Sequence, residues 1–324
     1  MGRGCGIVYV LISLYQACAI QNILLGVAFM AGWDDILEEI KNSPLKNSVD
    51  AIRRKYLKEL SDLTSRNTIA YYSSWLVRQV ENTDINDNDM NGFMDTVKGL
   101  DCSKGLDLIL HTPGGSPMAA EAIVKYLRSK FGKNIRVIVP QLAMSAGTMI
   151  ACSANEIIMG KHSSLGPIDP QLNGIPAYSI QSEFDDAKAD LAQGNQNFNY
   201  WRLLLSKYPA AYVKMASDAI ALSDTLLREW LVTGMLEGEN DNAIEKVCTS
   251  LNEHLDSKVH SRHFDMSFCK SIGLHIMELE SDQALQDAVL SVHHAYVHTF
   301  SASSAVKIIE NQQGKAFISL SRQQ

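Results

Sequence analysis

Two turns, each following a short apolar run, limit the fold of this chain more than any other feature. One turn, His111-Thr112-Pro113-Gly114-Gly115, follows the apolar residues 106–110; the other, Met144-Ser145-Ala146-Gly147, comes soon after residues 135–139. Such runs predict strands, and residues 117–129 between them predict a helix. Strand, helix and strand at this spacing indicate a parallel βαβ unit. Both turns then lie near the carboxyl ends of strands, where ligand crevices form in α/β sheets.

The rest of the apolar pattern extends the same architecture. Further strands are predicted at 68–72 and 156–159, and helices at 48–64 and 179–193. Residues 200–252 predict two or three more helices, and the tail mixes helical segments with short runs at 305–309 and 316–318. The Gly- and Pro-rich run 163–171 predicts an extended loop across the site. The pattern therefore predicts an α/β protein with helical additions.

Composition narrows the functional classes. The net charge of −7 and the pI near 5.7 argue against a nucleic-acid partner, which would need a concentrated basic patch. The six cysteines are scattered, with no Cys-x-x-Cys pair, so neither a zinc site nor a disulfide framework is expected. Reduced thiols are typical of the cytoplasm, which is the expected location. No cofactor or metal is expected.

The first 32 residues allow two interpretations. Residues 4–32 are the most apolar part of the sequence and are long enough for a membrane anchor, which would make the protein membrane-associated. Against an anchor, Gln16, Gln21 and Asn22 fall near the middle of that stretch, where polar side chains are costly in lipid. Alternatively, residues 1–29 are an upstream extension and Met30 is the functional start.

Ser145 is the best candidate nucleophile. A serine attacks only when its hydroxyl is exposed at a turn beside a base, and the small neighbours Ala143, Ala146 and Gly147 leave room for an acyl group. The backbone N–H groups of Gly114 and Gly115, which no side chain shields, suit an oxyanion hole. Taken singly, each turn could equally be plain capping or a Pro-Gly turn.

Together these motifs resemble those of a known family. Pro113-Gly114-Gly115, Ser145-Ala146-Gly147-Thr148, Gly166-Pro167-Ile168-Asp169-Pro170-Gln171 and Lys307-Ile308-Ile309-Glu310-Asn311 are similar to motifs of the serine dehydrogenase proteinases, relatives of Clp proteases and signal-peptide peptidases. The resemblance implies a Clp/crotonase-like core of repeated ββα units with a parallel sheet. It also implies a serine endopeptidase that is independent of ATP, acts on peptides or proteins, membrane proteins included, and forms homo-oligomers.

The resemblance also suggests a division of the chain. N-terminal helices would occupy 30–66, the catalytic core 67–199, and a helical region packed on the core 200–324. Residues 1–29 stand apart, and Met30-Ala31-Gly32-Trp33 matches the family at its start.

The general base is the point where this chain departs from the Clp pattern. Clp proteases carry a histidine where this chain has Pro167-Ile168-Asp169-Pro170. Signal-peptide peptidases instead use a lysine forty to fifty residues after the serine, and Lys188 lies at that distance. A Ser–Lys dyad is therefore expected, because a lysine buried among apolar groups loses its charge and can accept a proton.

Two alternatives stay open. Asp169 with His260 or His263 would form a triad in the order Ser, Asp, His, since a triad is defined by geometry and not by sequence position. The other alternative is a non-catalytic peptide-binding scaffold with the same fold. His111 is interpreted as structural, and a metal site at His293, His294 and His298 is not expected because a third ligand at suitable spacing is lacking.

Overall fold

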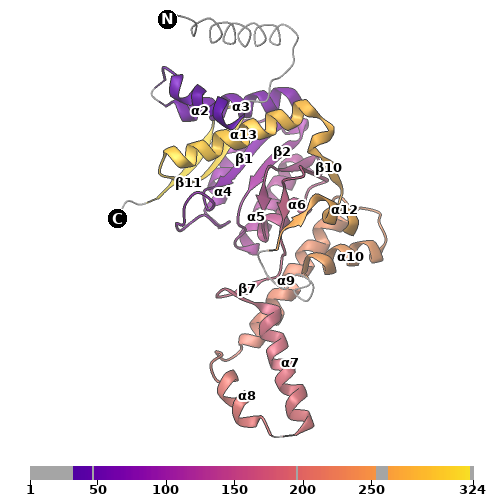
Figure 1. Ribbon diagram of the computed structural model, residues 1–324. Helices are drawn as coiled ribbons and strands as arrows, with labels where there is room; N and C mark the ends of the chain where they lie inside the picture. The colour runs from indigo at the N-terminus through magenta and orange to yellow at the C-terminus, as the bar shows by residue number, and fades with distance from the viewer. Residues whose placement is uncertain (1–31, 46, 195, 253–261, 322–324) are drawn as a thin grey trace, which may run out of the picture.

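A seven-stranded sheet forms the centre of the protein. The computed structural model describes residues 32–45, 47–194, 196–252 and 262–321 (Figure 1). The strand order is β10-β5-β3-β2-β1-β11-β12, and the first five of these strands run parallel, whereas β11 is antiparallel to β1 and to β12. The strands are β1 Asn67–Ser73, β2 Leu106–His111, β3 Ile135–Val139, β5 Glu156–Met159, β10 Ile276–Glu278, β11 Ala305–Asn311 and β12 Ala316–Leu320.

Helices cover both faces of the sheet because the central strands are apolar on both sides. Ile69 and Tyr71 of β1 belong to the cluster on one face, and Ala70 and Tyr72 belong to the cluster on the other. The first face is covered by α4 Asp89–Val97, α5 Pro117–Phe131, α6 Ala146–Cys152, the end of α9 Tyr212–Val232, α10 Asp241–Asn252 and α12 Met266–Ile272. The second face is covered by α2 Trp33–Asn42, α3 Ser48–Thr64 and α13 Gln283–Ala302 (Figure 1).

An arm extends from this core. It consists of α7 Ala177–Gln193, α8 Phe198–Leu205 and the first half of α9 (Figure 1). A small apolar cluster between α7 and α9 holds it together, and α8 contains no buried residue. At its base lies a hairpin of β7 Gln171–Leu172 and β8 Ile175–Pro176.

The predicted α/β fold with a parallel sheet and helical additions is confirmed by this topology. The expected division of the chain differs from the observed one in two respects. The boundary at 199/200 falls inside the arm, and β10, β11 and β12 of the supposedly helical C-terminal region complete the central sheet.

The interpretations of residues 1–29 concern a part of the chain outside the described residues. In the part that the structure does describe, every helix is either too short or too polar to cross a lipid bilayer.

Candidate active site

Ser145 lies in a strained turn between β4 Leu142–Ala143 and α6. Its φ of 51° and ψ of −116° are unfavourable for a residue that carries a side chain. Such a conformation costs about 1–3 kcal/mol and persists only where the surroundings impose it, most often at functional sites. Ser145 is partly exposed, whereas every residue of α6 is buried. The turn thus presents the hydroxyl at the start of a rigid, buried helix.

The glycine turn packs directly against the serine turn. Backbone hydrogen bonds join Thr112 N to Leu142 O (3.1 Å) and Met144 N to Thr112 O (3.0 Å). A Cβ on Gly114 would lie 2.6 Å from Met144 O and 2.7 Å from Ser145 Cβ, and Gly114 has φ +99°. Only glycine allows the two turns to approach this closely.

The backbone N–H groups at this junction have different roles. The Gly114 N–H donates to Thr112 Oγ1 at 3.2 Å. The Gly115 N–H and the Ala146 N–H have no acceptor within the described part of the chain, and Gly115 is exposed. Of the two predicted oxyanion donors, Gly115 is therefore available and Gly114 is engaged. Ala146 was missed by the sequence reasoning, although the residue after a nucleophile commonly supplies such an N–H.

The loop after β6 Ser164–Leu165 passes beside α6, as the Gly- and Pro-rich sequence predicts. The Gly166 N–H donates to the Thr148 hydroxyl at 2.9 Å, and that hydroxyl lies 2.9 Å from both the Ala143 and Gly166 carbonyl oxygens. Further along the loop, Asp169 is only 1% exposed. This part of the site is rigid and holds a carboxyl group out of solvent.

A second, three-stranded sheet connects the strand before the serine turn with the segment that carries one candidate histidine. Its order is β4-β6-β9, where β9 is Phe264–Asp265 and pairs antiparallel with β6. The pairing of β4 with β6 ends at Ala143 opposite Leu165, and the pairing of β6 with β9 ends at Leu165 opposite Phe264, the residue after His263. His263 is exposed. His260 lies outside the described residues.

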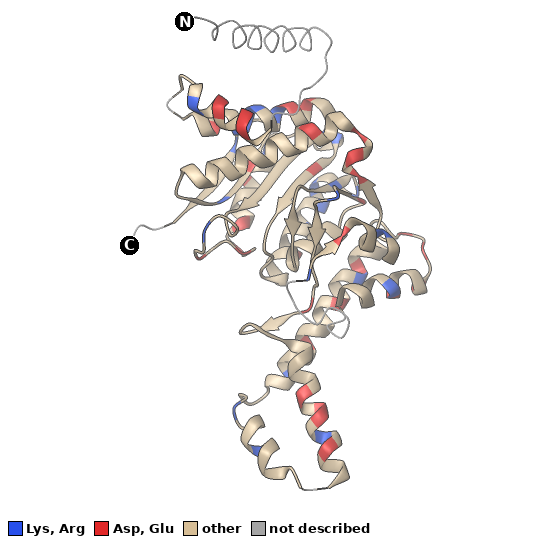
Figure 2. Cartoon of the chain, in the orientation of Figure 1, with Lys and Arg blue, Asp and Glu red and all other residues tan. Residues whose placement is uncertain are grey.

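The structure contradicts the expected setting of Lys188. Its side chain is 74% exposed and forms an ion pair with Asp185 at 2.8 Å, so it is not buried among apolar groups. Asp185, Asp186 and Asp190 flank it in the sequence of α7, a helix on which Figure 2 shows mainly red segments among the charged ones. Helix α7 packs on α9 in the arm and does not return across the serine turn (Figure 1). Within one copy of the chain, Lys188 therefore does not reach Ser145.

His111, beside the glycine turn, lies in a buried aromatic cluster. Its ring contacts the rings of Tyr72, Trp75 and His293, and the Leu142 N–H points to its Nδ1 at 3.4 Å. Burial lowers the pKa of His111 well below its usual value, with a smaller effect from His293. His111 thus supports the strand before the turn as a neutral ring.

Acidification is expected to destabilise the fold through His293. A histidine in the unfolded chain titrates near pH 6.5, whereas burial, assisted by His294 and His162, lowers the pKa of His293 to about 3. Between these pKa values only the unfolded chain binds the proton, so the stability present above pH 6.5 is lost as the pH falls toward 3. The free energy of unfolding in urea should drop by about 2–3 kcal/mol from this group between pH 7 and pH 4.5.

The control for this effect is His293→Asn, which keeps a polar side chain without a titratable ring. Its free energy of unfolding should depend less steeply on pH over the same range, and equal slopes in the variant and the wild type would contradict the assignment to His293.

Comparison with known proteins agrees with the motifs. Residues 80–196 match the family model of the ClpP-like SDH-type serine proteinases, which confirms the resemblance for a segment that contains both turns, Asp169 and Lys188. Two curated relatives are uncharacterized proteins of Methanocaldococcus jannaschii. MJ0137 is 43% identical over a segment that covers 36% of this chain and 46% of its own length. MJ1495 is 49% identical over a segment that covers 23% of this chain and 25% of its own length. The chain thus spans less than half the length of these relatives.

Among solved structures, a serine-to-alanine mutant of the 1510-N membrane-bound stomatin-specific protease matches with 20% identity and a TM-score of 0.26. That match covers 60% of this chain and 92% of the other. A TM-score this low does not bear on the fold.

Proposed function

We propose that this chain, whose residues 80–196 match the ClpP-like SDH-type serine proteinases, is a serine peptidase-like hydrolase that forms an acyl-enzyme on Ser145. The observation that carries the proposal is the strained conformation of Ser145 (φ 51°), held against Gly114 at a distance that only glycine permits. A serine used only to cap a helix would not need φ > 0, since capping residues normally adopt extended backbone.

The reaction divides into acylation and deacylation. The Ser145 Oγ attacks the scissile carbonyl carbon while a base takes its proton, and the C–N bond then breaks as the amine leaves with that proton. The N–H groups of Gly115 and Ala146 are the proposed donors to the oxyanion, since both lack an internal acceptor in the described residues. Gly114 contributes differently: because it lacks a Cβ, the glycine turn can pack against the serine turn. Water then hydrolyses the acyl-enzyme, and no step needs ATP.

For the base, the triad alternative is better supported than Lys188. Asp169 is buried in the loop that follows β6, and His263 directly precedes β9, which pairs with β6. His260 precedes it in the chain and remains the second candidate. A dyad with Lys188 would need the lysine of another copy of the chain, because within one copy it is exposed and paired with Asp185.

The base is identified by comparing four single variants. We expect either His263→Ala or His260→Ala to lower kcat about 10²- to 10⁴-fold, the usual contribution of a general base. Lys188→Met should keep the wild-type rate. His275→Ala, another exposed histidine, is the matched control. If Lys188→Met abolished turnover while both histidine variants retained it, the triad would be wrong and a dyad between copies would replace it.

Labelling with a fluorophosphonate tests the function itself. We expect the wild-type protein to be labelled without nucleotide and Ser145→Ala not to be labelled. A well-folded wild-type protein that resisted the probe would instead support the non-catalytic peptide-binding scaffold.

The proposed substrates are peptides or proteins, because the matching family is one of proteinases. Membrane proteins are proposed among them on the resemblance of the motifs alone. A homo-oligomer belongs to the same proposal. Its support is the arm, where Phe198, Tyr200 and Leu203 of α8 expose large apolar surfaces. The four cysteines in the described residues are free thiols, which supports the proposed cytoplasmic location.

A further inference from the structure

We propose that the buried ion pair between Lys307 and Asp89 positions the Gly115 N–H for catalysis. The inference rests on the proposed function, because it assigns a role in the same site to residues on β11 and α4. It makes Lys307 and Asp89 positioning residues, since neither contacts the reacting atoms.

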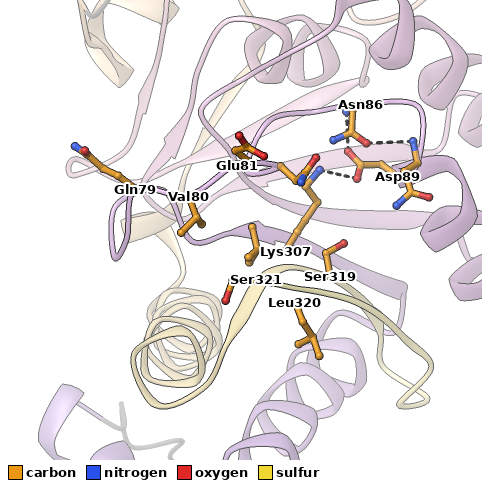
Figure 3. A pocket seen from close by; sticks show the side chains of 12 residues that line it. Gln79, Val80, Glu81, Asn86, Asp89, Lys307, Ser319, Leu320 and Ser321 are labelled. Carbon is orange, nitrogen blue, oxygen red and sulfur yellow. Dashed lines mark hydrogen bonds and ion pairs between the residues drawn. The ribbon is translucent and has the colours of Figure 1, made fainter. Parts of the chain in front are cut away.

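The ion pair holds the backbone on both sides of Ile85. Lys307 Nζ lies 2.7 Å from Asp89 Oδ1 and donates to Asp84 O at 2.5 Å, and the other carboxylate oxygen of Asp89 accepts from Asn86 N at 3.0 Å. The Tyr71 hydroxyl donates to that second oxygen at 2.8 Å. Figure 3 shows the Lys307 ammonium directed at the Asp89 carboxylate, with Asn86 beyond it. The pair therefore fixes the carbonyl before Ile85 and the N–H after it.

Ile85 is in turn the support for the glycine turn. Its N–H donates to Gly114 O at 2.7 Å, and its carbonyl accepts from Ser116 N at 2.8 Å. These bonds flank Gly115 on either side. A Cβ on Gly115 would lie 2.4 Å from both Ile85 N and Ile85 O, so the two backbones touch. A shift of Ile85 must move Gly115 with it.

A hollow of about 1100 Å³ adjoins the ion pair, and its lining includes Asn86, Asp89 and Lys307 (Figure 3). The Lys307 side chain is nevertheless only 2% exposed and the Asp89 side chain only 1%. A buried ion pair is a poor way to gain stability alone, because apolar residues of the same volume often do as well. Apolar residues, however, could not hold Asp84 O and Asn86 N.

The same strand provides a matched control. Glu310 of β11 forms a buried ion pair with Arg53 at 2.6 Å on the other face of the sheet, and both side chains are fully buried. The Arg53 guanidinium donates to Asp50, Thr299 and Glu310 and lies over the Tyr296 ring, and none of these residues belongs to the 84–86 or 112–116 segments. Its loss should affect stability without moving Gly115.

The test compares Lys307→Met, Lys307→Arg and Arg53→Met with the wild type. Hydrogen exchange is read on the peptide spanning 113–117, where prolines at both ends leave only the N–H groups of Gly114, Gly115 and Ser116. In Lys307→Met we expect Ser116 to exchange about tenfold faster or more. The second-order rate of fluorophosphonate labelling, per folded molecule, should fall about 10- to 100-fold. Lys307→Arg should restore most of the protection from exchange at Ser116 and most of the labelling rate, because the hollow accommodates the larger guanidinium.

Arg53→Met should unfold at lower temperature than the wild type yet keep wild-type exchange at Ser116 and wild-type labelling per folded molecule. Equal behaviour of Lys307→Met and Arg53→Met in both readouts would overturn the inference. If Lys307→Met does not fold, Tyr71→Phe decides the question by the same two readouts, since it removes one hydrogen bond to Asp89. If wild-type Ser145 does not react with the probe, the proposed function fails, and exchange at Ser116 alone decides the inference.

Discussion

Replacing Ser145 by glycine is expected to give a protein that is inactive and more stable than the wild type. The variant loses the nucleophile, so single-turnover hydrolysis should fall at least about 10⁴-fold. Glycine adopts the backbone angles of residue 145 without strain, whereas serine at φ 51° does not. The free energy of unfolding in urea should therefore rise by about 1–2 kcal/mol.

Two controls separate strain from chemistry. Ser145→Ala keeps a Cβ at the strained position, so it should be inactive while its stability stays within about 0.5 kcal/mol of the wild type. Ser65, which ends α3 with φ 55°, is strained at a position outside the site. Ser65→Gly should gain stability and keep full activity. A Ser145→Gly protein no more stable than Ser145→Ala would show that the turn stores no strain.

Gly114→Ala is expected to lower kcat about 100-fold or more while leaving a folded protein. The added methyl would lie 2.6 Å from Met144 O and 2.7 Å from Ser145 Cβ, so the serine turn must shift. A displacement of about 1 Å at a reacting group can cost about 10²-fold in rate. Steady-state hydrolysis of a peptide, with kcat and KM measured separately, checks the expectation.

Gly132→Ala is the matched control for Gly114→Ala. Gly132 also has a positive φ, +60°, but a Cβ there meets nothing within 4 Å. Its replacement should cost about 1 kcal/mol of stability from the backbone conformation alone and leave kcat unchanged. A similar loss of kcat in both variants would mean that global destabilisation, and not the contact with the serine turn, lowers the rate.

Strands β1, β2, β3 and β5 of the sheet and the two turns could be predicted because their signals are local. Residues 135–139 and 156–159 are short, mostly apolar runs, each preceded by Asn and followed by Pro or Gly, and they form β3 and β5 with the predicted bounds. The turns follow from Pro, Gly and Ser at fixed positions after such runs. Parallel strands then bring the ends of neighbouring runs together, which is why Gly114 and Ser145 meet.

The position of the base could not be predicted because it depends on tertiary packing. Lys188 lies at the expected distance along the sequence, but the direction of α7 is set by contacts with α9, not by its own periodicity. His263 directly precedes β9, which pairs with β6, and each of these strands has only two residues. Strands that short give no periodic signal.

A different signal was available for Lys307. It is a charged residue in the otherwise apolar run Ala305-Val306-Lys307-Ile308-Ile309, which forms the buried strand β11. Buried lysines are almost always paired. The sequence could therefore have indicated that Lys307 needs an acidic partner, although not that Asp89 supplies it.

The place of β11 in the central sheet has a consequence for the order in which the protein is made. This strand is encoded near the end of the sequence, yet it lies beside β1, which is synthesised early. A chain still on the ribosome before residue 305 has been translated contains Ser145 and both glycines but lacks the Lys307 ammonium that holds Asp84 and Asp89. On the inference drawn above, the 84–86 segment and Gly115 gain this support only after β11 has been translated and has paired with β1.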